Sequence, residues 1–92
     1  MILKEFVMDR NKVKEFIVDY IQREYTIPEN VDIMNLNYVE EGYIDSLGLI
    51  QFIASVEDEF GIFFSDDELS GEDVKVVGRM VDLIVDKMKR AM

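Results

Sequence analysis

The sequence predicts an all-α fold, a bundle of three main helices and one short helix with a long loop between the first two. Three segments carry apolar residues at the three- and four-residue spacing of amphipathic helices, and no segment alternates between apolar and polar residues as a strand does. A chain of 92 residues can bury one hydrophobic core but not two. We therefore expect residues 1–92 to form a single domain, with residues 1–8 as a candidate N-terminal extension.

The first helix is predicted to run from Asp9 to about Glu24. Its apolar residues follow the pattern of one helix face: Val13, Phe16, Ile17, Tyr20 and Ile21. Asp9 or Asn11 could cap its start. The sequence leaves open whether the apolar residues before this point extend the helix or form a separate packed arm: Leu3, Phe6 and Val7.

A long loop is predicted between the first two helices, at residues 26–44, because Pro28 ends the helical pattern and asparagines follow it. This loop is longer than the usual connection between helices, so we expect its apolar residues to hold it against the core. These residues are Val31, Ile33, Met34, Leu36 and Val39.

The second helix is predicted from Ser46 to Phe60, with Asp45 or Ser46 as the capping residue and Gly61 at its end. At about 100° per residue, one narrow face of this helix carries the core stripe. That stripe consists of Leu49, Phe52, Ile53, Val56 and Phe60.

The second helix also has another apolar face. Leu47, Ile50 and Ala54 lie on the opposite or flanking side, with Gln51 and Asp58 between them. An aliphatic strip edged by acid fits a docking surface, on which aliphatic contacts give affinity and carboxylates attract a basic partner. It also fits a central helix that the bundle covers on several sides, and the periodicity does not decide between these interpretations.

The last part of the chain contains a short helix and the third main helix. Ser65 and Glu68 have the spacing of a capping box, and Gly71 ends the short helix. This acidic stretch lacks the pattern of a calcium-binding loop, so we interpret it as a capped, solvated surface. The final helix is predicted from about Val76 to Arg90. Its inner face carries Val77, Met80, Val81, Ile84 and Met88, and its last turn carries Lys87, Lys89 and Arg90.

The composition restricts the function. There are 20 acidic and 10 basic residues, which give a net charge of -10. This charge repels nucleic acid and anionic lipid, and it favours basic protein partners. It also opposes self-association. The chain has neither cysteine nor histidine, the residues from which most catalytic pairs and zinc sites are built. We therefore expect a monomer that is not an enzyme and has no metal site, no nucleic-acid partner and no membrane partner.

The location is predicted from what the sequence lacks. No apolar run approaches the ~20 residues of a membrane-spanning helix. The first residues do not form a secretory signal, because Lys4 and Glu5 interrupt the apolar start. We therefore expect a cytoplasmic location.

Ser46 is the candidate functional residue. A serine after an aspartate at a helix start is usually only a cap. Here the residues around it extend the pattern: Asp45, Ser46, Leu47, Ile50, Phe52, Ile53, Val56, Glu57, Phe60, Gly61 and Ile62. This stretch resembles the phosphopantetheine attachment region of acyl carrier and peptidyl carrier proteins, and the resemblance extends from about Glu41 to Ile84. The family often has proline at the position of Ser65 and threonine at that of Val76, departures that affect helix ends only.

The resemblance implies an acyl-carrier-like bundle and a carrier function. In this family the serine takes 4'-phosphopantetheine from coenzyme A as a phosphodiester, which makes the chain a phosphoprotein, and the thiol of the arm holds acyl or aminoacyl groups as thioesters. The resemblance thus makes Ser46 the attachment residue and Asp45 part of the adjacent motif. The residues implied to dock partner enzymes are Leu47, Ile50, Gln51, Ala54, Glu57 and Asp58.

The implied partners are enzymes. They are a phosphopantetheinyl transferase, an adenylate-forming acyl or aminoacyl synthetase or an acyltransferase, and later enzymes of fatty acid or secondary metabolite biosynthesis. Gly48 stands where a larger side chain could crowd the arm or a docked enzyme, or it could be neutral variation. The alternative function is an unmodified acidic helical adaptor that docks a basic partner through the second helix.

Overall fold

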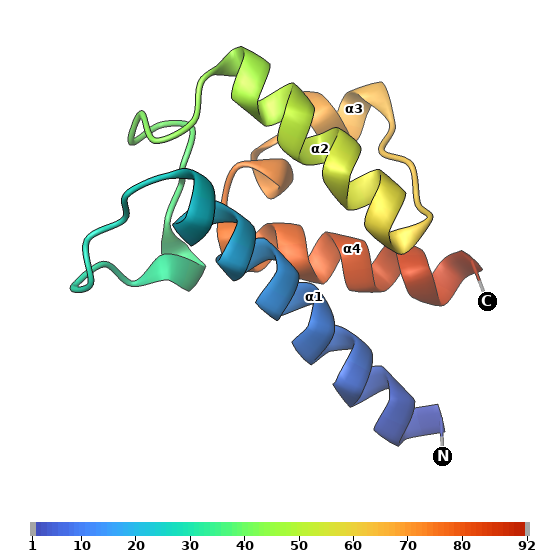
Figure 1. The fold of residues 1–92 in the computed structure, drawn as a ribbon. Helices are drawn as coiled ribbons and strands as arrows, with labels where there is room; N and C mark the ends of the chain where they lie inside the picture. Colours follow the sequence, from blue (N-terminus) through green and yellow to red (C-terminus); the bar gives the residue numbers. More distant parts are fainter. Residues whose placement is uncertain (1, 92) are drawn as a thin grey trace.

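The described part of the chain contains four α-helices and two short 3₁₀ helices (Figure 1). The computed structural model describes the backbone of residues 2–91 and the side chains of residues 10–90. The elements follow in this order: α1 (Ile2–Glu24), η1 (Ile33–Asn35), α2 (Ser46–Phe60), α3 (Asp66–Ser70), η2 (Glu72–Val74) and α4 (Val77–Ala91). The predicted bundle of three main helices and one short helix is confirmed, and α2 has the predicted bounds.

Helix α1 begins earlier than the sequence predicted. It starts at Ile2, so Asp9 and Asn11 lie inside the helix, and the prediction that one of them caps its start is wrong. The physical reason is that residues 2–8 contain good helix formers and neither glycine nor proline. The backbone of Leu3, Phe6 and Val7 is therefore helical, while their side chains lie outside the described residues.

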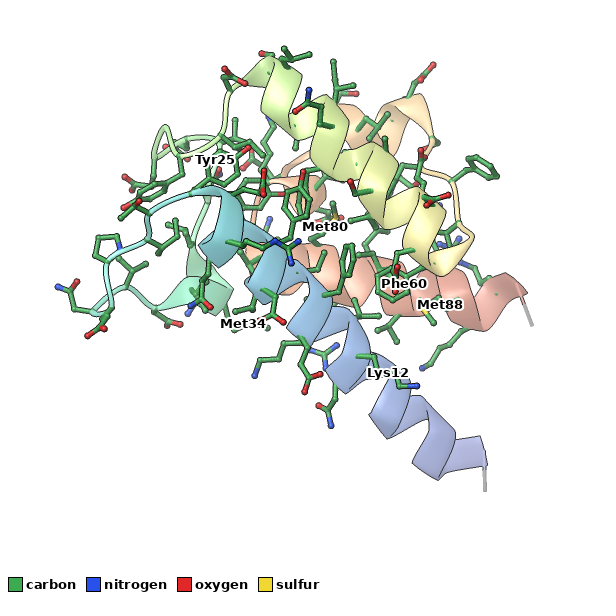
Figure 2. All side chains as sticks on the ribbon, in the orientation of Figure 1. Lys12, Tyr25, Met34, Phe60, Met80 and Met88 are labelled. Atoms are coloured by element: carbon green, nitrogen blue, oxygen red, sulfur yellow. The ribbon has the colours of Figure 1, made fainter. Side chains whose placement is uncertain are left out.

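The core forms where α1, α2 and α4 meet. Figure 1 shows α1 and α2 sloping in the same direction, with the end of α2 over α4, and Figure 2 places Met80 in the interior between the helices. The ring centroids of Tyr20 and Phe52 are 4.7 Å apart, and those of Phe16 and Phe60 are 5.4 Å apart in an edge-on arrangement. Aromatic contacts therefore join α1 to α2. The fully buried helix residues are Val13, Ile17, Ile21, Phe52, Val56, Val77, Met80, Val81 and Ile84. No described helix is both long enough and apolar enough to span a bilayer.

The long loop is held against the core, as predicted. Leu36 is buried, and the other predicted residues are half-buried and pack against the core: Val31, Ile33, Met34 and Val39. The backbone of the loop also pairs with the segment before α4, which the sequence did not predict. The N–H of Tyr38 donates to the carbonyl of Lys75 at 3.1 Å, and the N–H of Val77 donates to that of Leu36 at 3.1 Å.

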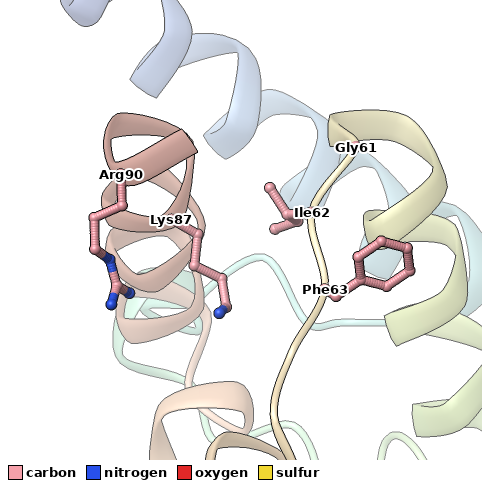
Figure 3. Close-up of a pocket in the computed structure, with 5 residues that line it drawn as sticks. All are labelled: Gly61, Ile62, Phe63, Lys87 and Arg90. Atoms are coloured by element: carbon pink, nitrogen blue, oxygen red, sulfur yellow. The ribbon is translucent and has the colours of Figure 1, made fainter. Parts of the chain in front are cut away.

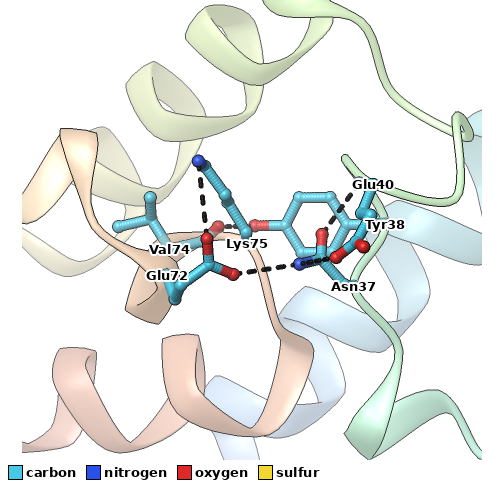
Figure 4. A network of polar contacts seen from close by, with 6 residues as sticks. All are labelled: Asn37, Tyr38, Glu40, Glu72, Val74 and Lys75. Atoms are coloured by element: carbon cyan, nitrogen blue, oxygen red, sulfur yellow. Dashed lines mark hydrogen bonds and ion pairs between the residues drawn. The ribbon is translucent and has the colours of Figure 1, made fainter.

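Tyr38 is the central residue of this pairing (Figure 4). Its ring is buried beside Phe52, and its hydroxyl donates a hydrogen bond to the carbonyl of Val74. Its own carbonyl accepts from the N–H groups of Tyr43 at 3.0 Å and Ile44 at 3.1 Å. One residue therefore connects the segment before α4 with the turn that leads into α2.

Polar side chains close the edge of the same pairing (Figure 4). The amide of Asn37 donates to Glu72 at 3.2 Å and to Glu40 at 3.3 Å. Lys75 forms a loose ion pair with Glu72 at 3.9 Å. Because these groups are largely exposed, they contribute less to stability than the buried bond of Tyr38.

We predict that Tyr38→Phe lowers the free energy of unfolding by about 1–3 kcal/mol, because the carbonyl of Val74 loses a buried partner. Burial raises the pKa of Tyr38 above the ordinary value of 10.0. Stability from the neutral hydroxyl is thus fully present below about pH 10 and is lost as the pH rises above it, because the unfolded chain releases the proton first. Urea unfolding at neutral and alkaline pH should show that the unfolding free energy falls more steeply with pH for the parent than for the variant. An equal fall for the two proteins would contradict this.

The contact between Gly78 and the loop yields a second prediction. A Cβ on Gly78 would lie 2.8 Å from the carbonyl oxygen of Met34, a backbone atom that cannot turn aside. Gly78→Ala should therefore lower the unfolding free energy by roughly 1–3 kcal/mol. Gly71→Ala is the matched control, since its Cβ would meet only ordinary contacts at 3.6 Å. Equal denaturation midpoints for the two variants would rule out the close approach.

Candidate functional site

Ser46 is the first residue of α2, at an exposed end of the helix. The start of α2 lies at the upper edge of the molecule in Figure 1, away from α4. Among the described residues, the hydroxyl of Ser46 has no hydrogen-bond partner. The oxygen is therefore both accessible and free to react.

Asp45 is the residue that caps α2, which decides between the two predicted capping candidates, Asp45 and Ser46. Its backbone is extended, and its Oδ1 accepts a hydrogen bond from the N–H of Gly48 at 2.7 Å. Its carbonyl accepts from the N–H of Leu49 at 2.8 Å. Because Asp45 does the capping, the side chain of Ser46 is left for another role.

Gly48 faces the interior rather than the surface. It is buried, and a Cβ there would lie 2.8 Å from Oη of Tyr25 and 2.9 Å from Cγ1 of Ile44. The sequence did not predict this internal packing. A side chain at position 48 would push aside the side chains of Tyr25 and Ile44.

The second apolar face of α2 is exposed. Leu47 and Ile50 have 64% and 66% of their surface accessible to solvent, and no other part of the described chain covers them. Gln51, Ala54 and Asp58 are exposed beside them. The interpretation that the bundle covers this face is therefore wrong. The five residues form one continuous surface that starts directly after Ser46, and we call it the α2 outer face.

An apolar groove lies between α2 and α3, next to Ser46. Its volume is about 450 Å³, and it is lined by Ser46, Leu49, Ile50, Ile53, Ala54, Glu57 and Leu69. Glu57, which the resemblance implied to be a docking residue, is half-buried here, and its Oε2 accepts a hydrogen bond from the N–H of Phe64 at 3.0 Å. Glu57 therefore also fixes the segment that follows α2.

A second hollow of about 420 Å³ lies at the opposite end of α2 (Figure 3). Lys87 and Arg90 of α4 line it together with the segment that contains Phe63. Phe63 is 81% exposed, and its ring points away from α4. Both cations are already paired, Lys87 with Glu68 at 2.8 Å and Arg90 with Asp86 at 2.9 Å. This hollow is thus remote from Ser46 and offers no unpaired charge.

The acidic segment around α3 is a capped surface, as predicted. Ser65 and Glu68 form the reciprocal bonds of a capping box, at 3.2 and 2.8 Å. Burial acts to raise the pKa of Glu68, but its hydrogen bonds with Lys87 and Ser65 outweigh burial and lower it. No group of side chains that could hold a metal ion is found in the described residues.

Charge is segregated along the chain, which could have been read from the sequence but was missed. From Glu24 to Val74, both included, there are 14 of the 20 acidic residues and no lysine or arginine. This segment contains Ser46, the α2 outer face and the groove. The site therefore lies in an acidic field that attracts basic partners.

Comparison with known proteins agrees with this geometry. The family model described as "Phosphopantetheine attachment site" matches residues 15–84, starting earlier than the resemblance found from the sequence. The acyl carrier protein of Lactobacillus acidophilus is 35% identical over 74 residues, which cover 80% of this chain and 85% of that protein. That of Coprothermobacter proteolyticus is 32% identical over 77 residues, covering 84% and 92%. No solved structure gave a significant match.

A phosphopantetheine arm fits the described site. The arm needs an accessible hydroxyl, and Ser46 provides one beside two backbone N–H groups, its own and that of Leu47, that have no acceptor among the described residues. These groups lie at the positive end of the α2 dipole, where a phosphodiester is stabilised. The family match over residues 15–84 and the similarity to acyl carrier proteins agree with this fit. The chain therefore belongs to the acyl carrier protein family of phosphopantetheine-binding proteins, whose members carry a covalently attached 4'-phosphopantetheine and are not catalysts.

Proposed function

We propose that Ser46 is the attachment residue, and that the chain holds acyl or aminoacyl intermediates as thioesters and presents them to partner enzymes. The observation that carries this proposal is the exposed, unbonded hydroxyl of Ser46 at the start of α2, within the matched region. We also propose that the chain is a single monomeric domain with a cytoplasmic location.

Loading forms one bond and breaks one. Oγ of Ser46 attacks the phosphorus that carries the pantetheine group in coenzyme A, the pyrophosphate linkage breaks, and adenosine bisphosphate leaves. The hydroxyl proton passes to a base, which we assign to the phosphopantetheinyl transferase, since the neighbouring carboxylate of Asp45 already accepts a hydrogen bond from the N–H of Gly48. The bound arm supplies a thiol, which a chain without cysteine lacks.

Asp45 and the helix dipole act on the linkage in opposite directions. The N–H groups of Ser46 and Leu47 favour the negative charge of a phosphodiester, whereas the carboxylate of Asp45 repels it. Asp45 still benefits the site, because its bond to the N–H of Gly48 fixes the first turn of α2. We infer that Asp45 shapes this turn and helps to orient the active site of the transferase.

The α2 outer face is proposed as the surface that partner enzymes recognise. Leu47 and Ile50 are exposed aliphatic residues close to Ser46, and Gln51, Ala54 and Asp58 continue the surface along the helix. A partner with apolar contacts and a basic rim would complement it. The proposed partners are the transferase, an adenylate-forming synthetase or an acyltransferase that loads the thiol, and the biosynthetic enzymes that use the cargo.

The groove between α2 and α3 can cover apolar atoms of a group attached at Ser46. It opens beside this residue, and its walls include the aliphatic side chains of Leu49, Ile53 and Leu69. Sheltering apolar atoms there removes them from water. The groove thus supports a cargo with an apolar part.

We predict that incubation with coenzyme A and a broad-specificity phosphopantetheinyl transferase adds the mass of one phosphopantetheine group to the chain. Ser46→Ala should remain unmodified, because it lacks the accepting oxygen. Ser55→Ala is the matched control on the same helix and should be loaded like the parent, since the hydroxyl of Ser55 donates to the carbonyl of Gln51. Intact-protein mass spectrometry measures all three.

An unmodified parent, or a modified Ser46→Ala variant, would overturn the attachment site. If a partner protein binds Ser46→Ala as tightly as the parent, and the parent is not loaded, the adaptor alternative replaces the carrier function.

The α2 outer face yields a separate prediction. Leu47→Ala should raise the KM of the transferase for this carrier by about tenfold, because a central aliphatic contact is lost. The unfolding free energy should change little, since Leu47 is exposed. Phe63→Ala is the matched control, as it removes an exposed apolar side chain at the other end of α2. If both variants have the parent's KM, the α2 outer face does not dock the transferase.

A further inference from the structure

Tyr25 lies against the first turn of α2. It is the first residue after α1, and its side chain is half-buried against the core. Figure 2 shows it at the end of α1, beside the loop that leads into α2. Its hydroxyl oxygen is 2.8 Å from the position that a Cβ on Gly48 would occupy. We call this approach the Tyr25–Gly48 contact.

Two further groups converge on the same glycine. A Cβ on Gly48 would lie 2.9 Å from Cγ1 of Ile44 and 3.2 Å from Oδ1 of Asp45. Ile44 and Asp45 are the two residues that precede Ser46. Any side chain at position 48 would therefore displace Tyr25 or the residues that set the direction of the chain into Ser46.

The hydroxyl of Tyr25 is neutral in this position. Burial, and then the neighbouring groups Tyr20, Asp45 and Glu24, raise the pKa of Tyr25 above its ordinary value. A neutral oxygen can remain next to the capping carboxylate of Asp45 without repelling it. The Tyr25–Gly48 contact is thus compatible with the hydrogen bond from the N–H of Gly48 to Asp45.

We propose that Tyr25 is a positioning residue for Ser46, and this inference rests on the function proposed above. The cap formed by Asp45 is local and joins only residues of the first turn of α2. Tyr25 reaches that turn from α1, so it fixes the orientation of the turn relative to the rest of the bundle. Ser46 belongs to this turn, and its hydroxyl must reach the phosphorus of coenzyme A in a narrow range of geometries.

The test compares four variants in the loading reaction with coenzyme A and a broad-specificity transferase: Tyr25→Phe, Tyr25→Ala, Gly48→Ala and the double variant Tyr25→Phe/Gly48→Ala. Tyr25→Ala and Gly48→Ala should lower kcat roughly tenfold, with a smaller change in KM, because the hydroxyl of Ser46 is misplaced after binding. Tyr25→Phe loses the oxygen of the contact but keeps the ring, so its kcat should fall less than that of Tyr25→Ala.

The double variant distinguishes the loss of the Tyr25–Gly48 contact from a general loss of stability. Tyr25→Phe removes the oxygen closest to the new Cβ, so the double variant should load faster than Gly48→Ala alone. Recovery should be partial, because the contact with Ile44 remains. Gly78→Ala is the control for lost stability, since its contact is with the carbonyl of Met34, and it should keep the parent's kcat.

Amide exchange gives a readout that does not depend on the transferase. In Tyr25→Ala the N–H of Gly48 should exchange faster than in the parent, while that of Ile84 in α4 should change only by the loss of global stability. If Tyr25→Ala and Gly48→Ala both load at the parent's kcat, or the double variant shows no recovery, the positioning role is overturned while the carrier function remains. If the parent itself is not loaded, both proposals fail.

Discussion

The site depends on the backbone pairing that holds Tyr38 between two distant parts of the chain. The loop from α1 to α2 is long enough to carry a large entropic cost of ordering, which buried contacts must offset. Tyr38 provides them, because its ring contacts Phe52, its hydroxyl bonds to Val74, and its carbonyl holds the N–H groups of Tyr43 and Ile44. Through these bonds the turn before Ser46 has a fixed position relative to α4 and the core.

One face of helix α2 packs in the core, and another face is exposed to solvent. Phe52 and Val56 are fully buried, whereas Leu47 and Ile50 are exposed, although all four are apolar. The bundle packs one face of α2 against α1 and the core and leaves the other face uncovered. The remaining apolar face adjoins Ser46, in the segment that has no basic residue. An exposed hydroxyl, exposed aliphatic side chains and negative charge are therefore combined on a single helix.

Several properties of the site follow from short-range rules. An aspartate before a helix binds the free N–H groups of the first turn, so the serine that follows has no capping duty. The absence of cysteine means that any thiol must come from an added group. The charge distribution determines which partners can approach. None of these properties gives the chain a catalytic group, so catalysis is left to partner enzymes.

The sequence predicted the helices, the bounds of α2, the capping box of the short helix and the candidate residue Ser46, because periodicity, capping and short motifs are local and require no knowledge of distant residues. It did not reveal the start of α1, the pairing of Tyr38 with the segment before α4, or the reason for Gly48. The fold alone shows that the second face of α2 is exposed, since exposure depends on which other elements pack there. It also showed that Tyr25 and Gly48, which are 23 positions apart, approach each other, because contacts between distant residues leave no periodic signal in the sequence.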